Sequence, residues 1–519
     1  MKPFVGRAAL AAAFLSLSAS IPAHEAPGTP ARLGKVHFKV ECNAAAQREF
    51  NVAMAYYHSF AWHQMQAPLE QVLKGDPSCG MAHWLRALAA LNNPFAWPTV
   101  ISAATLSEGP RILETARSTG LKSQRERDYV DALAAFFKGS EHKARAEALE
   151  NALQHLMYKY AEDSEAATLY ALILSANFDP ADKSYTNQLQ AAGILEGIFK
   201  AQPEHPGVAH YLIHSYDYPP IAMRGLDAAR RYGKVAPDAP HALHMPSHIF
   251  TRVGAWKESV ESNRASARAA GQQKSFDKWH AYDYMVYAHL QLGQDKAARQ
   301  VVSEALANPP RIDHPATAYA YAAMPARLAI ERGAWKEAAG LALRPADFPW
   351  AKYTFAEAIN AYARGIGAAM SGDAAGGRAQ VARLQALRGA TKVPYWAQEI
   401  DVQSAVVTSL ALCAEGKRVA CLDGLRAAAD REDAGEKHVV TPGRLVPARE
   451  VLAYALLDGG EPIVALREFE AVLERDPNRL RTFAGAANAA KSFGNAGKAA
   501  EYSARLAALT AEADTPLGK

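Results

Sequence analysis

The chain has 519 residues, and its 57 lysines and arginines almost balance its 53 aspartates and glutamates. Such an even balance of charge argues against a nucleic-acid-binding protein and against a protein that binds anionic membrane surfaces. The sequence is rich in alanine and has few β-branched runs with a period of two, which predicts an all-helical fold.

Residues 1–23 have the pattern of a secretory signal. Lys2 and Arg7 precede the apolar run 8–19, and Ile21-Pro22-Ala23 is an acceptable cleavage site. The apolar run is too short to span a bilayer, and no later run approaches the required length. We therefore expect an exported protein, periplasmic or secreted, without a membrane span; an uncleaved anchor is the alternative.

Four cysteines fit an exported protein. They form two local pairs, Cys42 with Cys79 and Cys413 with Cys421, and this pairing is favoured among the three that are possible. Each bond would contribute about 2–4 kcal/mol of stability. A metal role for these cysteines is disfavoured because no C-x-x-C spacing occurs.

Outside the central part, the chain predicts helical pairs of varying regularity. After an extended segment at 24–45, residues 46–204 read as irregular pairs. There His58, His63 and His83 lie among aromatic residues and are interpreted as core positions. Residues 346–445 predict further pairs and an exposed polar linker at 431–444, and 446–512 predict two regular units before a frayed tail at 513–519.

The central part, residues 205–345, carries a repeated histidine pattern. His210 and His214 are four residues apart, and His244 and His248 repeat this spacing after a shift of 34 residues. Residues four apart share one face of a helix, so each pair is expected to project from one side of its helix.

A repeated pentapeptide gives the period of the array. Gly-Ala-Trp-Lys-Glu occurs at Gly254–Glu258 and Gly333–Glu337, and Gly293 lies 39 and 40 residues from the two leading glycines. Together with the run 455–479, these units resemble the tetratricopeptide repeat (TPR), a pair of antiparallel helices of about 34 residues. The resemblance implies an all-α, right-handed superhelical solenoid of helix pairs.

The resemblance also implies a concave groove, lined by the first helix of each unit. Fixed places ahead of the turn glycines select the groove-facing residues, which are His241, His244 and His248, then His280, Asp283 and Tyr287, then Ala320, Ala323 and Arg327. The 34-residue shift adds His210 and His214 to the same rows.

Several imidazoles in one groove favour a transition metal, with Zn or Cu the ions that an exported protein meets readily. The predicted metal ligands are His210, His214, His244, His248 and Asp283. The predicted ligand-binding residues are His241, Arg252, His280, Tyr287 and Arg327, which could grip a carboxylate-bearing peptide or a protein partner. The alternative is that repeat symmetry gathers the histidines and neighbouring tyrosines satisfy them.

No enzyme signature supports a catalytic role. The run HYLIH differs from the zinc-protease motif because Tyr211 replaces the catalytic glutamate, and nucleophile-elbow, P-loop and dinucleotide motifs are absent. The sequence thus favours an exported TPR-like binding scaffold over an enzyme. The remaining alternative is a metal-dependent hydrolase that uses the histidines, with Asp283 or Glu258 as base.

Overall fold

The computed structural model describes residues 31–273, 275–307 and 312–514, and these residues form helices and no strand. The predicted signal, residues 1–23, lies outside the described residues. Within the described ranges, none of the helices combines the length and the apolar composition that a bilayer span requires. The described residues from Arg32 onward belong to one compact unit.

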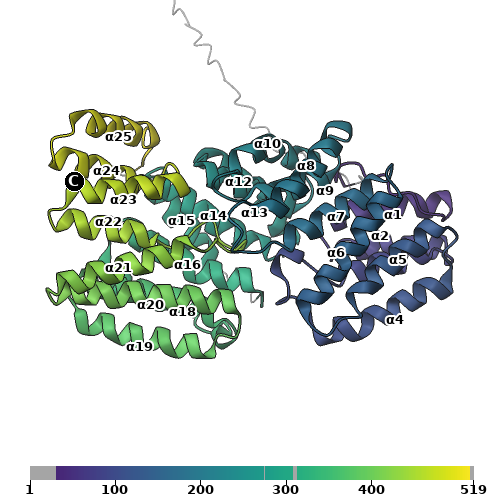
Figure 1. Ribbon diagram of the computed structural model, residues 1–519, viewed down its shortest axis with the longest axis horizontal. Helices are drawn as coiled ribbons and strands as arrows, with labels where there is room; N and C mark the ends of the chain where they lie inside the picture. Colours follow the sequence, from purple (N-terminus) through teal and green to yellow (C-terminus); the bar gives the residue numbers. More distant parts are fainter. Residues whose placement is uncertain (1–30, 274, 308–311, 515–519) are drawn as a thin grey trace, which may run out of the picture. The chain divides into compact units, whose positions relative to one another are not determined.

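The helices follow one another along the whole described chain, separated by short turns (Figure 1). The first group is α1 (Ala44–His58), α2 (Gln66–Gly75), α3 (Gly80–Ala89), η1 (Pro94–Ala96), α4 (Ala103–Thr119), α5 (Gln124–Phe136), α6 (His142–Lys159), α7 (Ser164–Ala176) and α8 (Thr186–Ala201). The central group is α9 (Pro206–Tyr216), η2 (Ala222–Gly225), α10 (Leu226–Val235), α11 (Pro240–His244), α12 (Pro246–Val253), α13 (Trp256–Gln273), α14 (Asp277–Gln291), α15 (Asp295–Ala307), α16 (Pro315–Glu331) and α17 (Trp335–Ala339). The last group is η3 (Trp350–Lys352), α18 (Thr354–Met370), α19 (Ala374–Ala390), α20 (Pro394–Ala414), α21 (Arg418–Asp433), α22 (Ala448–Asp458), α23 (Pro462–Arg475), α24 (Leu480–Ser492) and α25 (Ala496–Leu509).

The architecture is a solenoid of helix pairs, as the sequence predicts. Each helix packs on its neighbour in sequence, and alternate helices such as α14, α16 and α18 also contact one another. The pair α22 and α23 and the pair α24 and α25 are seen side by side in Figure 1. Gly254 and Gly293 turn the chain between helices with φ of +69° and +70°, a conformation that only glycine adopts without cost.

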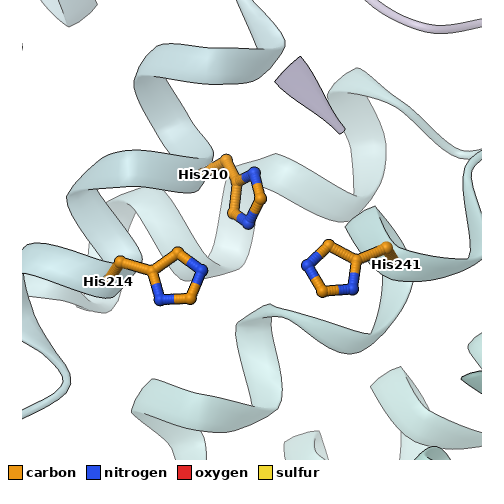
Figure 2. Close-up of side chains that lie close together, drawn as sticks. All are labelled: His210, His214 and His241. Carbon is orange, nitrogen blue, oxygen red and sulfur yellow. The ribbon is translucent and has the colours of Figure 1, made fainter. Parts of the chain in front are cut away.

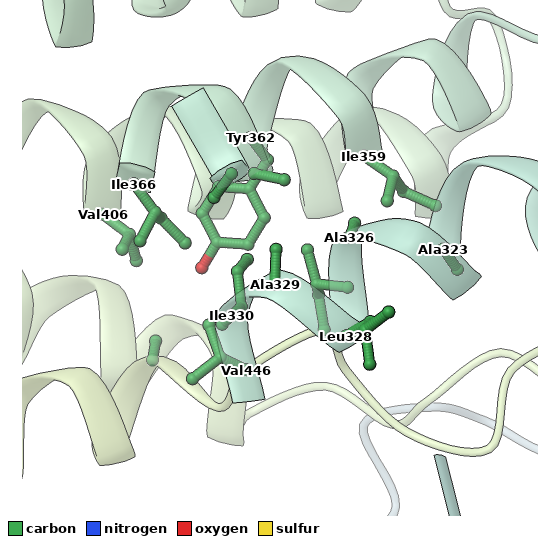
Figure 3. Packing of buried hydrophobic residues seen from close by; sticks show 14 of the residues in the cluster. Ala323, Ala326, Leu328, Ala329, Ile330, Ile359, Tyr362, Ile366, Val406 and Val446 are labelled. Carbon is green, nitrogen blue, oxygen red and sulfur yellow. The ribbon is translucent and has the colours of Figure 1, made fainter. Parts of the chain in front are cut away.

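Apolar residues fill the space between the helix layers. In the second half of the chain, Ile359, Tyr362 and Ile366 of α18 pack over α16 (Figure 3). The facing positions of α16 include Ala326 and Ala329, whose small side chains let the two helices approach closely. This core contains residues between 267 and 502, and a second large core contains residues between 33 and 250, so each half of the array has its own interior.

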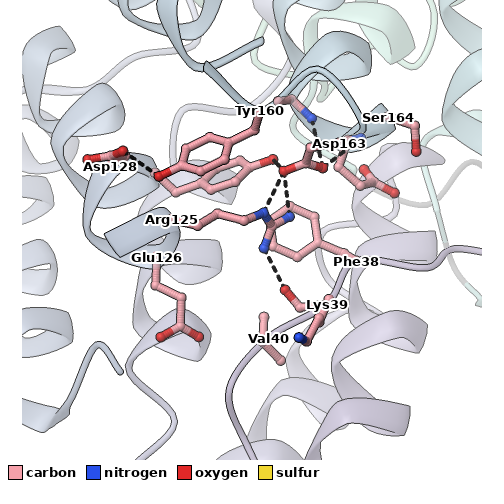
Figure 4. Close-up of polar contacts among 12 residues, drawn as sticks. Phe38, Lys39, Val40, Arg125, Glu126, Asp128, Tyr160, Asp163 and Ser164 are labelled. Carbon is pink, nitrogen blue, oxygen red and sulfur yellow. Dashed lines mark hydrogen bonds and ion pairs between the residues drawn. The ribbon is translucent and has the colours of Figure 1, made fainter. Parts of the chain in front are cut away.

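The segment ahead of α1 is extended and anchored to the first helical pairs. Phe38 is fully buried, and the guanidinium of Arg125 lies 4.8 Å from the centre of its ring. Arg125 also donates to the Lys39 carbonyl at 2.7 Å and to Asp163 at 2.6 Å (Figure 4). A single arginine therefore joins this segment, α5 and the start of α7.

The cysteines pair locally, as predicted. The sulfur atoms of Cys42 and Cys79 are 1.98 Å apart, and those of Cys413 and Cys421 are 1.97 Å apart. The first bond ties the extended segment to the N-terminus of α3, and the second closes the turn between α20 and α21.

The prediction that the polar linker at 431–444 is exposed is wrong. Residues 435–447, here called the strap, contact α14 and α16. Glu436 and Thr441 of the strap are only 8% and 4% exposed. Tyr284 donates to the Thr441 carbonyl at 3.0 Å, and Arg327 donates to the Gly443 carbonyl at 2.9 Å. Polar composition alone predicts solvent exposure, whereas these polar groups satisfy buried partners on the helices.

Candidate metal centre

Helix α9 places two histidines in the interior. Pro206 occupies its first turn, where a missing N–H costs nothing, and the His205 ring caps it by accepting from the Val208 N–H at 3.3 Å. His210 and His214 follow one turn apart and are 0% and 4% exposed. The helix is buried all round, so both rings face other protein groups.

Three rings meet at the first cluster, here called triad A: His210, His214 and His241. One nitrogen of each ring lies within 4.8 Å of the others. Figure 2 shows the two α9 rings facing His241, which comes from α11. Sequence analysis selected all three residues, but it assigned His241 to a general ligand and not to the metal set.

The free nitrogens of triad A point inward. His210 Nδ1 donates to the His58 carbonyl at 2.7 Å, which leaves the lone pair on its Nε2 available. The buried Nε2 atoms of His210, His214 and His241 have no hydrogen-bond partner. His241 Nδ1 lies 3.6 Å from Asp277 Oδ1, the position of an orienting carboxylate.

A second cluster, triad B, consists of His244, His248 and His280, again with one nitrogen of each ring within 4.8 Å of the others. Pro246 lies between the first two histidines. The helical hydrogen bonding is interrupted there, so α11 ends at His244 and α12 begins at Pro246, although Met245 between them keeps right-handed helical dihedrals (φ −51°, ψ −36°). The third ring, His280, comes from α14.

The hydrogen bonds of triad B fix its tautomers. His244 Nδ1 lies 2.6 Å from Asn263 Oδ1, and the amide orientation follows from Asn263 Nδ2, which donates to the Ser259 carbonyl at 2.7 Å. His248 Nδ1 lies 2.9 Å from Asp217 Oδ2. Both rings thus carry their proton on Nδ1, yet their Nε2 atoms are 3.2 Å apart. Two lone pairs facing at this distance need a cation between or beside them.

The 3.2 Å separation matches metal coordination. With Zn–N bonds of about 2.0–2.1 Å, neighbouring nitrogens of a tetrahedral site lie about 3.3–3.4 Å apart. A shared proton would also reconcile the two acceptors. However, burial lowers the pKa of His248 to about 4, with Lys437 adding to the effect and Asp217 opposing it. At neutral pH the ring is therefore a neutral ligand.

Four of the other rings are also poised as neutral ligands. Burial is the largest cause that holds the pKa values of His210, His214, His244 and His280 well below the usual range, and neighbouring histidines add to it. A neutral imidazole has a lone pair to offer a metal, whereas an imidazolium does not.

The structure groups the predicted metal ligands differently from the sequence analysis. The four histidines His210, His214, His244 and His248 are divided between the two triads, and each triad is completed by a ring from the other predicted set, His241 or His280. Asp283 lies apart from both triads, because its two oxygens accept from Arg327 Nε at 2.9 Å and Nη2 at 3.4 Å.

The remaining predicted residues contact other protein groups. Arg252 Nε donates to Asp217 Oδ1 at 2.8 Å, and the other oxygen of the same carboxylate lies 2.9 Å from His248 Nδ1. Tyr287 accepts from Arg479 Nη1 at 2.9 Å. Arg252 and Tyr287 are thus already engaged by other buried side chains.

Sequence analysis missed the groups that hold the rings in place, which are Asp217, Asn263 and Asp277. Asp217 follows His214 by three residues, a spacing that could have been noticed. The other two contact their rings from α13 and α14, across helix boundaries, and no local pattern signals them.

A third group, His58, Glu165 and His205, is closed. Glu165 contacts His58 Nε2 at 3.0 Å and His205 Nε2 at 2.8 Å. The second nitrogen of His58 lies 2.9 Å from the Tyr211 hydroxyl, and that of His205 caps α9. Because all four ring nitrogens are occupied, this group is a structural network, and His58 is the core residue that the sequence predicts.

No family model matches the chain, and no curated protein matches it. Solved structures with similar arrangements are the P58(IPK) TPR domain, at 12% identity over 88% of this chain and 100% of that chain (TM-score 0.22), and Naa15/Naa10 bound to HypK-THB, at 12% over 90% and 73% (TM-score 0.26). A circular tandem repeat protein is 13% identical over 90% and 95%, with a TM-score of 0.12. Scores this low carry no argument, so the TPR-like description rests on this chain's own helix pairs and glycine turns.

Proposed function

We propose that this protein binds transition-metal ions, one in each histidine triad. The observation that carries the proposal is the 3.2 Å approach of His244 Nε2 to His248 Nε2, with both Nδ1 protons directed away. The three imidazoles of each triad form a ligand set that Zn and Cu accept.

The surroundings of the rings support this proposal. Metal-binding histidines usually donate their second ring N–H to a carboxylate, an amide or a carbonyl, which fixes the tautomer. His210 has the His58 carbonyl in this role, His244 has Asn263, and His248 has Asp217. Three of the six rings are therefore oriented with Nε2 as the ligand atom.

Metal analysis of the purified full chain tests the proposal. After removal of metal with a chelator and reloading with Zn²⁺, we expect two ions per chain by elemental analysis. His244→Ala combined with His248→Ala should reduce this to one, whereas His155→Ala, on the exposed face of α6, should leave two. Circular dichroism checks that each variant remains helical.

Two outcomes would contradict the proposal. A wild-type chain that retains no ion after gel filtration would show that the rings are only packed histidines. Retention of both ions by the double variant would place the metal elsewhere.

The other predicted functions receive less support from the geometry. A carboxylate-bearing peptide would have to compete with Asp217 for Arg252 and with Asp283 for Arg327. A protein partner in the groove, and export to the periplasm or beyond, remain predictions. For a hydrolase, the predicted base Glu258 pairs instead with Arg230 at 2.9 Å, and Asp283 is held by Arg327.

A further inference from the structure

The six histidine rings form one continuous cluster. The closest ring centres of different triads are 6.0 Å apart, between His214 and His248, and 6.2 Å apart, between His241 and His244. Within triad B, His248 and His280 are 6.4 Å apart. The closest approach between the triads is therefore similar to the longest printed ring spacing inside triad B, and α11 contributes a ring to each triad.

The charge around this cluster favours monovalent ions. Neither triad contains a carboxylate ligand. Asp217 is the nearest acid of triad B, and it is already compensated by Lys437 and Arg252, each at 2.8 Å. Asp277 near His241 is the other acid. Two divalent ions would bring four positive charges into this buried site and two cuprous ions only two, and the desolvation cost grows with the square of each ion's charge.

Building on the proposed function, we propose that the two triads form one dinuclear copper centre that binds dioxygen. Each Cu(I) is held by three imidazoles, a ligand type suited to copper. Dioxygen binds between the ions: each copper gives one electron, both become Cu(II), and the dioxygen becomes a bridging peroxide. Release reverses the transfer, so the step requires no proton, reductant or other co-reactant.

Aromatic side chains enclose the cluster and suit it to a diatomic ligand. Phe95 stacks on His214 with ring centres 3.9 Å apart, Phe60 lies 4.4 Å from His210, and Tyr284 lies 4.7 Å from His244. Such a site keeps water from a bound peroxide, which would otherwise be protonated and lost. It also leaves little room for a large substrate.

Spectroscopy of the wild-type full chain tests the inference directly. The metal-free protein is loaded with Cu(I) under nitrogen and should hold two coppers. On exposure to dioxygen we expect an intense peroxide-to-copper absorption band that fades under vacuum, together with no electron paramagnetic resonance signal, because the two Cu(II) spins couple. A signal that integrates to two independent spins, or no spectral change with dioxygen, would overturn the inference.

Two conservative variants sharpen the test. His241→Gln and His280→Gln each remove one ring from one triad, and each should lower copper to one per chain and abolish the dioxygen band. His155→Gln is the matched control and should retain both. Two independent coppers in the wild type would leave the proposed function standing and remove only this inference, whereas failure to bind copper or zinc at all would remove both.

Discussion

Two regions of this protein bury polar clusters in opposite ways. Beside the strap, Arg327 donates from all three nitrogens, to Asp283, to the Thr441 hydroxyl and to carbonyls of the strap. Arg479 similarly donates to Glu450, Glu331 and Tyr287. In the centre, six histidine rings of the two triads lie together, and the Nε2 atoms of triad A have no partner.

The difference separates a structural cluster from a binding site. The arginine clusters contain their own counter-charges, so nothing further is needed to make them stable. The histidine cluster leaves the Nε2 atoms of triad A without partners and sets two Nε2 atoms of triad B face to face, an arrangement that a bound cation would complete. Buried polar groups therefore indicate function when they are oriented and left unpaired.

The largest expected effect is in the arginine cluster around Arg327. Arg327→Ala would leave the fully buried Asp283 carboxylate without its partner and should lower the free energy of unfolding by about 3–5 kcal/mol. Urea denaturation measures this loss. Arg505→Ala, which breaks an exposed pair with Glu501, should cost only about 0.3–0.5 kcal/mol. Equal effects of the two variants would show that burial does not distinguish these pairs.

In the histidine cluster, replacing a ring should change the stability of the metal-free protein little but should remove stabilisation by metal. His280→Leu replaces a buried ring by an apolar side chain of similar volume, so the metal-free protein should change by less than about 1.5 kcal/mol. Metal at 100 times its dissociation constant should stabilise the wild type by about 2.7 kcal/mol per site, and the triad B share should vanish in the variant. Thermal unfolding with and without Zn²⁺ measures both. Full metal stabilisation of His280→Leu would contradict triad B.

A smaller effect is expected where a ring is only held in place. Asn263→Ala removes the acceptor of His244 Nδ1 and should weaken metal binding about 10–100-fold. The matched control is Ser266→Ala, also on α13 and buried, whose hydroxyl donates to the Pro240 carbonyl. Competition with a coloured chelator compares the affinities. Equal losses in both variants would indicate general loosening of α13.

The smallest effect concerns Lys437 of the strap, which forms an ion pair with Asp217. Burial lowers the pKa of Lys437 to about 8, although Asp217 opposes the shift, while an unfolded lysine titrates near 10.4. Between these values the unfolded state binds more protons, so the stability contributed by Lys437 rises with pH. The difference in unfolding free energy between the wild type and Lys437→Met should increase by about 1 kcal/mol from pH 8 to pH 9. A difference that stays constant or falls would show that the pKa of Lys437 is not lowered.

The sequence by itself determined the local features. Glycine turns such as Gly254 and Gly293, the helical pairs and the two local disulfides all follow from interactions between residues close in the chain. The four-residue histidine spacing correctly placed His210 and His214 together on one helix face. Counting from the turn glycines of the repeats also selected the other histidines of the two triads.

Only the tertiary structure decided how those rows meet. Spacing fixes the face of a helix but not the distance across helices, so it could not show that His241 joins α9 while His248 joins His280 of α14. The helical phase carries through Met245 between α11 and α12 and keeps His244 and His248 together, whereas the third ring of each triad comes from another helix. Counting back from the turn residue Gly293 puts Asp283 in the groove. Arg327 neutralises its charge instead, because the lowest-energy partner of a buried carboxylate is the nearest guanidinium. The polar strap is buried for the same reason: its partners come from helices more than 100 residues earlier in the chain.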